Sequence, residues 1–251
     1  MAPTDRDPAI IVLGYGVSDT LQLTVEAQRI LSRVGSVYAL YLPPNLARYL
    51  KSQRVSCVDL SDRFGAGRPF ADVYLEIVDL ILQRTAEERP VVLLTPGNPL
   101  FLNAVTRFLV QQARARDLPI RIHPGVSQVD TLVSYLGLDV TTFGLQLFDA
   151  QRLVSRRQPV NPAVPLLVLQ VAGFAASEAP AAVPPSAGEY APLADCLARF
   201  YAADQPVTLI NTSSNGRGPS HVTVQLSRFS ELVPHVRPES SLFIDRAKKS
   251  R

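Results

Sequence analysis

Short apolar runs alternate with segments of helical periodicity through the first half of the chain, and this alternation constrains the fold more than any other feature. Each run ends in turn-forming residues, as a buried parallel strand does. The segments between the runs carry apolar residues every three to four positions, as amphipathic helices do. A repeated strand–helix unit predicts a mostly parallel sheet wrapped by helices over residues 9–123. The predicted strands are residues 9–13, 36–42, 56–60, 90–95 and 120–123.

Four helices are expected between these strands. Thr24 precedes the first helical run and is a suitable N-cap. The other helices are expected at residues 46–50, 73–84 and 102–116.

The second half of the chain predicts a smaller lobe of mixed α and β structure. Residues 175–192 are rich in Ala and Pro, which predicts a mobile loop, and a Ser- and Gly-rich turn is expected at 212–219. We therefore expect a two-lobed α/β fold, with an N-terminal lobe at 8–123 and an α+β lobe at 124–247. The elements expected in the second lobe are helices at 129–136 and 193–201 and strands at 164–169, 206–211, 221–226 and 241–244.

Composition excludes several classes of protein. The 251 residues are 47% hydrophobic and 19% charged, so the chain can bury a core and is not disordered as a whole. The basic residues that give a net charge of +3 are scattered, with small clusters at 152–157 and 246–251, which does not favour a nucleic-acid partner. No run of about 20 apolar residues and no signal-peptide pattern occurs, so we expect a cytoplasmic protein without a membrane partner.

The cysteines and histidines form no metal-binding pattern. Cys57 and Cys196 lie far apart and outside any Cys-x-x-Cys spacing, and His123, His221 and His235 are not paired. We therefore expect no metal site, and we expect both thiols to be free and buried.

Three loops that follow predicted strands contain Gly or Pro, and parallel sheets bind ligands at the carboxyl ends of their strands. The first loop contains Gly14-Tyr-Gly16. It lacks the third glycine of a dinucleotide-binding fingerprint, because Asp19 stands in that place. This loop is therefore either a tight turn or a ligand-binding loop.

The second loop, Thr95-Pro-Gly-Asn-Pro-Leu-Phe101, has a restricted shape. Pro96 and Pro99 fix the backbone and remove two N–H donors, and Gly97 permits a positive φ or the close approach of a ligand. A stiff loop with free carbonyl groups suits an amine-bearing ligand better than a phosphate, which needs N–H donors. The alternative is an ordinary connection between a strand and a helix.

The third loop, Pro124-Gly-Val-Ser127, ends in a residue that can cap the next helix and can still contact a ligand. Tyr74 follows a Gly- and Pro-rich loop at 61–70, and its place on an apolar stripe fits either a core role or a catalytic role. No Ser/His/Asp triad and no pair of carboxylates is recognisable.

Together these motifs resemble those of the tetrapyrrole (corrin/porphyrin) methylase family. Residues 12–19 are similar to the family's Gly-x-Gly-Pro-Gly-Asp loop, and Leu23-Thr-Val-Glu-Ala27 to its Leu-Thr-x-x-Ala helix. Gly97-Asn98-Pro99 corresponds to Gly-Asp-Pro, and residues 124–127 keep the family's Pro-Gly-Val-Ser. The resemblance extends over nearly the whole chain.

Within the family, the chain looks most like the borosin-type peptide backbone N-methyltransferases. Shared features include Gly67-Arg-Pro69 before Tyr74, and Phe148-Asp-Ala150 before Arg157-Gln-Pro-Val160. The resemblance implies a homodimer that holds S-adenosylmethionine in a cleft between its two lobes. The residues that it assigns to this cofactor are Gly14, Gly16, Pro96, Gly97, Asn98, Leu100, Phe101, Leu102, Val126, Ser127, Gln128, Gln170, Val171 and Ala172.

The acceptor side departs from the borosin-type pattern. Those enzymes use several Tyr and an Arg beside the acceptor amide. Tyr74 matches one of these Tyr, but the Arg position falls near Phe70, and two Tyr positions fall at Phe64 and Ser61.

An amide nitrogen is a poor nucleophile, so its proton must be removed or its imidate form stabilised before it is methylated. We therefore predict Tyr74 and Arg68 as catalytic residues, with Arg63 as the alternative to Arg68.

Three functions remain open. The first is S-adenosylmethionine-dependent methylation of a nitrogen in a peptide or amide-like natural product that is supplied in trans. The second is C- or O-methylation of a precorrin, a porphyrin or another small molecule. The third is a protein of the same fold that binds a partner without catalysis.

Overall fold

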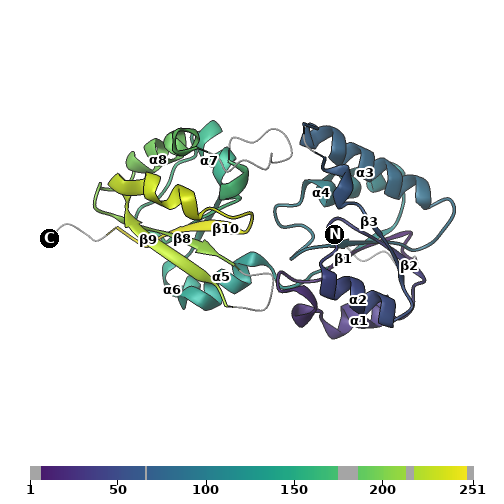
Figure 1. The fold of residues 1–251 in the computed structure, drawn as a ribbon. Coiled ribbons are helices and arrows are strands. Elements are labelled where there is room, and N and C mark those ends of the chain that lie inside the picture. Colours follow the sequence, from purple (N-terminus) through teal and green to yellow (C-terminus); the bar gives the residue numbers. More distant parts are fainter. Residues whose placement is uncertain (1–6, 66, 175–185, 213–217, 248–251) are drawn as a thin grey trace. The chain divides into compact units, whose positions relative to one another are not determined.

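The computed structural model describes residues 7–65, 67–174, 186–212 and 218–247 (Figure 1). Contacts within the chain divide it into two compact units, the first containing the described residues up to Thr131 and the second those from Leu132 onward. Among the described residues, no helix combines the length and the apolar character needed to cross a bilayer.

The first unit contains five strands in the order β3-β2-β4-β1-β5, and every neighbouring pair is parallel. This arrangement confirms the parallel sheet that the sequence predicts. The strands are β1 (Ile10–Gly14), β2 (Ser36–Ala39), β3 (Ser56–Asp59), β4 (Val91–Thr95) and β5 (Ile120–His123).

Helices cover both faces of this sheet, with α1 and α2 on one face and α3 and α4 on the other (Figure 1). Successive strand residues therefore enter different cores: Leu13 packs with α1 and α2, and Val12 packs with α3 and α4. Burial on both faces explains why the central strands β1 and β4 are almost wholly apolar, whereas the edge strand β3 is largely exposed. The helices are α1 (Val25–Leu31), α2 (Pro44–Ser52), α3 (Phe70–Arg84) and α4 (Ala104–Ala115), with 3-10 turns η1 (Asp19–Gln22) and η2 (Ser61–Arg63).

The helix starts follow the local chemistry of the chain. Thr24 accepts a hydrogen bond from the N–H of Ala27, which confirms it as the N-cap of α1. Asn103 caps α4 in the same way through the N–H of Thr106. α3 begins at Phe70, three residues before the predicted start, because Pro69 is compatible with the position before a first helical turn.

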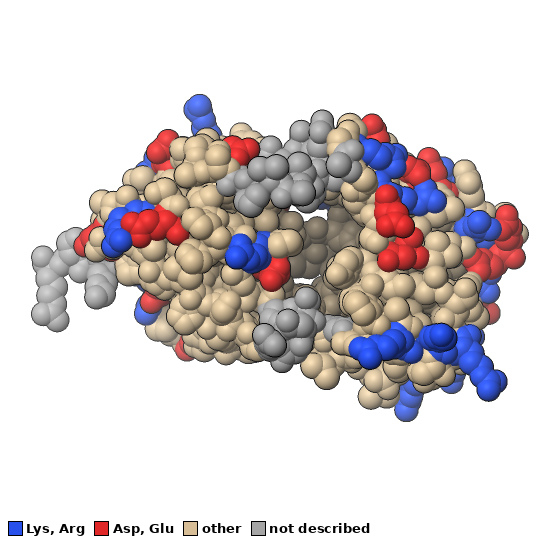
Figure 2. Space-filling view, in the orientation of Figure 1, with Lys and Arg blue, Asp and Glu red and all other residues tan. Residues whose placement is uncertain are grey.

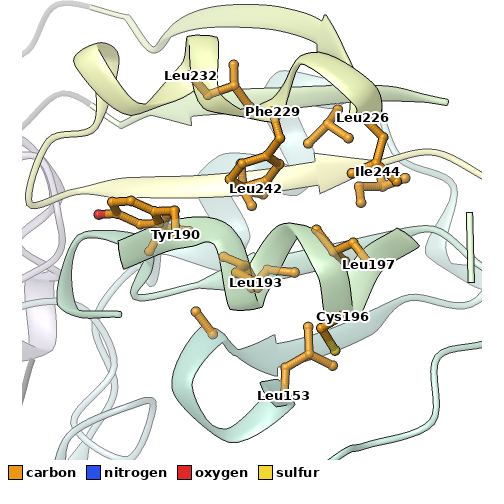
Figure 3. Close-up of a cluster of buried hydrophobic side chains, with 14 of the residues drawn as sticks. Leu153, Tyr190, Leu193, Cys196, Leu197, Leu226, Phe229, Leu232, Leu242 and Ile244 are labelled. Atoms are coloured by element: carbon orange, nitrogen blue, oxygen red, sulfur yellow. The ribbon is translucent and has the colours of Figure 1, made fainter. Parts of the chain in front are cut away.

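The second unit contains a mixed sheet in the order β6-β7-β10-β8-β9, in which only the β6–β7 pair is parallel. One face of the sheet packs against α7, α8 and η5. Figure 3 shows this core, in which Phe229 lies near Leu242 and Leu153 lies near Cys196. Helix α5 (Gln128–Leu136) spans the boundary between the two units. The elements that follow it are α6 (Val140–Phe143), β6 (Gln146–Asp149), α7 (Ala150–Ser155), β7 (Leu166–Leu169), η3 (Val171–Gly173), η4 (Ala187–Tyr190), α8 (Ala191–Ala198), β8 (Pro206–Asn211), β9 (Ser220–Gln225), η5 (Leu226–His235) and β10 (Ser240–Ile244).

Several predictions for the second half were incomplete or wrong. Four elements, α6, β6, α7 and η5, were not predicted from the sequence. The loop predicted at 175–192 is wrong for its last residues, since η4 and the start of α8 lie there, and Pro192 stands in the first turn of α8, where proline is tolerated. Residues 175–185 of that loop, and 213–217 of the predicted turn at 212–219, lie outside the described residues.

Both cysteines are free, as predicted, but only Cys196 is buried. Cys57 is half-buried on β3, where desolvation and then the neighbouring Asp59 carboxylate raise the pKa of its thiol to about 11. Since the thiolate is the reactive form, neither the burial nor the charge around Cys57 favours reactivity.

Candidate functional site

The three loops singled out in the sequence lie side by side in the first unit. All five strands are parallel, so their carboxyl ends share one edge of the sheet. β1 lies between β4 and β5, and therefore the loop after β1 lies between the loops after β4 and β5. This edge is where ligands bind in sheets of this kind.

The three loops are joined by a glycine from each. A Cβ atom on Gly14 would lie 2.2 Å from the carbonyl oxygen of Gly97 and 2.5 Å from the nitrogen of Gly125. A Cβ atom on Gly125 would lie 2.7 Å from the same oxygen and 2.7 Å from the carbonyl carbon of Gly14. These neighbours are backbone atoms that cannot rotate away, so only glycine fits at Gly14 and Gly125. We call this contact the glycine junction.

Hydrogen bonds hold the first two loops together. The N–H of Gly97 donates to the carbonyl of Gly16 at 2.9 Å, and the N–H of Tyr15 donates to the carbonyl of Thr95 at 3.0 Å. The side-chain oxygen of Gln22 accepts from the N–H groups of Val17 and Ser18 at 2.8 and 2.9 Å. The loop at Gly14–Gly16 is therefore more than a simple turn, because it is anchored at both of its ends.

The loop after β4 has a fixed shape and an apolar surface. Gly97 has a φ of 64°, and a Cβ atom there would lie 3.4 Å from its nearest neighbour, Val17 Cγ1. The requirement for glycine at this position therefore comes from the backbone conformation rather than from lack of space. Asn98 accepts from the N–H of Leu100 at 3.0 Å, and Leu102 has a φ of 54°. The side chains of Leu100 and Leu102 are 60% and 40% exposed, so both are available to a ligand.

The loop after β5 ends in a reciprocal cap on α5. Ser127 donates from its N–H and from its hydroxyl to Asp130 Oδ2, both at 2.7 Å, and the N–H of Asp130 returns a bond to Ser127 Oγ at 3.3 Å. The predicted capping role of Ser127 is therefore confirmed. Val126 and Gln128 flank it and are partly exposed.

The other predicted cofactor residues lie in the second unit, directly after β7. Gln170 is exposed and has a φ of 59°, which turns the chain into η3. The Val171 side chain is buried in the core of that unit, so only its main chain is free to contact a ligand. Ala172 is partly exposed.

Tyr74 lies in the second turn of α3, at the same edge of the sheet as the three loops. Its ring stacks on Phe70, with centroids 5.9 Å apart, and meets Phe64 edge to face at 6.1 Å. Burial raises the pKa of its hydroxyl, which forms no hydrogen bond with any described residue. Within the described part of the chain, Tyr74 therefore offers a neutral O–H group without a hydrogen-bond partner.

Arg68 and Arg63 converge on one carboxylate that the sequence analysis did not single out. Arg68 donates to Glu76 Oε2 at 2.7 Å and to the carbonyl of Arg63 at 3.0 Å, and Arg63 donates to Glu76 Oε1. The bond from Arg68, with the charges of both guanidinium groups, lowers the pKa of Glu76. No described contact joins Arg68 to Tyr74, so the two predicted catalytic residues belong to separate clusters.

Sequence reasoning also missed the role of Gly125 and Gln22. Gly125 was visible as part of a Pro-Gly turn, but its need for close backbone contact depends on two loops that are distant in sequence.

Among the described residues, no three His, Cys, Asp or Glu side chains are grouped so that they could hold a metal ion.

Curated relatives of this chain combine a methyltransferase with a peptide precursor in one protein. The chain is 27% identical over 236 residues to the methyltransferase/ribosomally synthesized cyclic peptide dendrothelin A precursor of Dendrothele bispora, covering 94% of this chain and 52% of that protein. It is 25% identical over 164 residues to the gymnopeptides precursor of Gymnopus fusipes, covering 65% and 39%. The chain thus spans about half the length of these relatives or less.

Solved structures share the fold. The uroporphyrin-III-C-methyltransferase from Thermus thermophilus superposes with a TM-score of 0.65 at 17% identity, covering 94% of this chain and 91% of that one. A structure of the Thermus enzyme complexed with S-adenyl homocysteine gives a TM-score of 0.60 at 20% identity, with 94% and 96% covered.

The family model of the tetrapyrrole (corrin/porphyrin) methylases matches residues 9–212, which include the whole parallel sheet and the glycine junction. Both the fold and the family predicted from the sequence are therefore confirmed: the chain belongs to the tetrapyrrole (corrin/porphyrin) methylase family.

Proposed function

We propose that this protein is an S-adenosylmethionine-dependent methyltransferase whose acceptor is a nitrogen of a peptide or amide-like compound. The glycine junction carries this proposal, because it fixes three loops at the carboxyl edge of a parallel sheet in a chain of the methylase family. The peptide acceptor is favoured by the curated relatives, whose names join a methyltransferase to a peptide precursor.

The residues of this edge fit the chemistry of the cofactor. Pro96 and Pro99 contribute carbonyl oxygens without N–H groups, which suits an ammonium group. The exposed Leu100 and Leu102 side chains suit the apolar faces of an adenosyl group. When bound, S-adenosylmethionine supplies an electrophilic methyl group, so the protein mainly has to hold the acceptor in line with it and exclude water.

The acceptor nitrogen must lose a proton, which passes to solvent, and we assign the stabilisation of the imidate-like acceptor to α3 and the loop before it. The Tyr74 hydroxyl is free to hydrogen-bond the acceptor. Arg68 remains the candidate for stabilising a developing imidate oxygen, because a guanidinium has five donors and the described contacts of Arg68 use two of its nitrogens. We also propose that the active form is a homodimer, which light scattering of the purified protein would test.

The first experiment measures the binding of S-adenosylmethionine and S-adenosylhomocysteine by isothermal titration calorimetry. We expect both to bind, and absence of both heats would refute the enzyme proposal. In a second step, S-adenosylhomocysteine formation and product mass are followed with apolar peptides and with uroporphyrinogen. Methylation of uroporphyrinogen alone would replace the peptide acceptor with a porphyrin-type one, and cofactor binding without methylation of either would favour a non-catalytic binding protein.

A further inference from the structure

Positive charge is concentrated in a short part of the chain. Residues 24–55 contain five basic residues and one acidic residue, for a net charge of +4. The whole chain carries +3, so all other residues together carry −1. The five basic residues are Arg29, Arg33, Arg48, Lys51 and Arg54.

The fold brings these five residues to one surface, which we call the α1–α2 face. Helices α1 and α2 lie on the same face of the sheet and direct their apolar residues, such as Leu31 and Leu50, into the core (Figure 1). All five basic side chains are exposed. Figure 2 shows a row of blue side chains where Figure 1 places these two helices.

The charges of the α1–α2 face are not neutralised within the described residues. None of the five basic side chains forms an ion pair there, and Arg48 bonds only to the neutral Asn45. The one acid of the segment, Glu26, lies 3.0 Å from His123 Nδ1 instead. Five like charges on neighbouring helices repel one another, and a negatively charged partner would relieve that repulsion.

The helix dipole accounts for only part of this arrangement. Arg29 and Lys51 lie in the last turns of α1 and α2, where a cation is favourable. Arg33 and Arg54 lie one residue beyond the C-caps of the same helices and are favoured in the same way. The dipole therefore leaves Arg48 and the lack of acids unexplained. Surface helices ordinarily mix both signs of charge, so the bias needs another cause.

Apolar side chains adjoin the basic ones. Leu21 is 75% exposed just before α1, and Val25 is 64% exposed in its first turn. A nucleic acid gains mainly from the cations, since its phosphates dominate affinity. An acidic polypeptide with apolar side chains would use the cations and also bury Leu21 and Val25.

We propose that the α1–α2 face docks an acidic polypeptide segment that belongs to the chain carrying the methyl acceptor. The docking step follows from the charge and exposure of this face, whereas the link to an acceptor rests on the proposed function. Docking at this face, which borders the loop after β1 at Leu21, would raise the local concentration of the acceptor near that loop.

The test uses a fluorescein-labelled peptide of Glu and Leu residues and follows its anisotropy. The triple variant Arg29→Glu, Arg33→Glu, Lys51→Glu should weaken binding about tenfold or more. The matched control, Arg152→Glu, Arg156→Glu, Arg157→Glu, makes the same change of net charge on exposed arginines of the second unit and should stay within about twofold. Equal losses in both variants, or none in either, would refute the docking site.

Two further measurements separate the alternatives. The double variant Leu21→Ser, Val25→Ser should weaken binding of the peptide while leaving that of a labelled single-stranded oligonucleotide unchanged. Tighter binding of the oligonucleotide by the unmodified protein would overturn the proposal in favour of a nucleic acid. Calorimetry with S-adenosylmethionine on the unmodified protein and on every variant keeps the two proposals apart. If the unmodified protein does not bind the cofactor but still binds the peptide, the proposed enzyme function is refuted and the docking site is not.

Discussion

Tyr74 combines a ring that packs against two other aromatic rings with a hydroxyl group that we propose contacts the acceptor. Its ring is held between Phe64 and Phe70, while its hydroxyl has no partner among the described residues. We expect Tyr74→Phe to lower kcat about a hundredfold, at the low end of the range for loss of one transition-state hydrogen-bond donor, and to leave the Kd for S-adenosylmethionine unchanged. Tyr49→Phe, on α2, is the matched control. Equal kcat in the two variants would remove Tyr74 from the proposed mechanism.

Removing the hydroxyl group from either of two buried tyrosines should stabilise the fold, whereas removing a hydrogen-bonded hydroxyl usually destabilises it. The hydroxyls of Tyr190 and Tyr201 are buried, and neither has a hydrogen-bond partner among the described residues. Because an unpaired buried polar group is destabilising, we expect Tyr190→Phe and Tyr201→Phe each to raise the free energy of unfolding by roughly 1 kcal/mol. Tyr15→Phe should instead lower it by about 1 kcal/mol, since Tyr15 donates to the carbonyl of Tyr41 at 3.1 Å. Urea unfolding measures all three.

At the scale of elements, the geometry of the three loops depends on the absence of a Cβ atom at the glycine junction. We expect Gly125→Ala to separate the loops after β1, β4 and β5 and to weaken S-adenosylmethionine binding at least tenfold. Gly35→Ala is the control, because nothing lies within 4 Å of a Cβ atom at that position. Calorimetry compares the two. If Gly125→Ala binds the cofactor normally, the ligand site does not depend on the junction.

The loop at 61–69 is fastened to α3 by Glu76, and this contact depends on pH. Its folded-state pKa lies below the ordinary value of 4.5, so the ionised carboxylate stabilises the fold above that pH. This stabilisation is lost as the pH falls through the folded-state pKa. We expect Glu76→Gln to reduce the loss of stability on acidification below pH 4.5, as measured by urea unfolding at several pH values. If the free energy of unfolding falls with acidification equally in both proteins, the contact of Glu76 with the two arginines does not contribute to acid sensitivity.

Elements were predicted well where their pattern was local and repeated. Strands β1 and β4 are apolar because both of their faces are covered, and the sequence shows this directly. The elements α6 and α7 were missed because each is only four to six residues long, too short for a periodicity to develop. A usable signal was present, since Asp139 and Asp149 cap these helices through their side chains.

For the whole molecule, the ionisation of buried tyrosines limits the stability of the fold at alkaline pH. Burial, joined in Tyr38 by a hydrogen bond to Glu88, raises the pKa of Tyr38, Tyr190 and Tyr201 to about 12 each. Because the folded state holds these protons more tightly than the unfolded chain, the free energy of unfolding is unaffected by them below the ordinary pKa of 10 and falls as the pH rises from 10 through 12. We expect the urea midpoint to fall between pH 10 and 12, together with a rise in tyrosinate absorbance. Tyrosinate formation near pH 10 without unfolding would show that these hydroxyls are accessible.

The sequence by itself determined the family, the parallel half of the fold and the three loops, because each depends on residues that are neighbours along the chain. Only the tertiary structure decided which glycines touch, which carboxylate Arg63 and Arg68 share, and that the five basic residues of segment 24–55 form one face. The glycines come from loops that are distant in sequence, and the other two features depend on how the helices are placed. Their contacts exist only after the strands have been ordered and the helices placed, and no local pattern encodes that ordering.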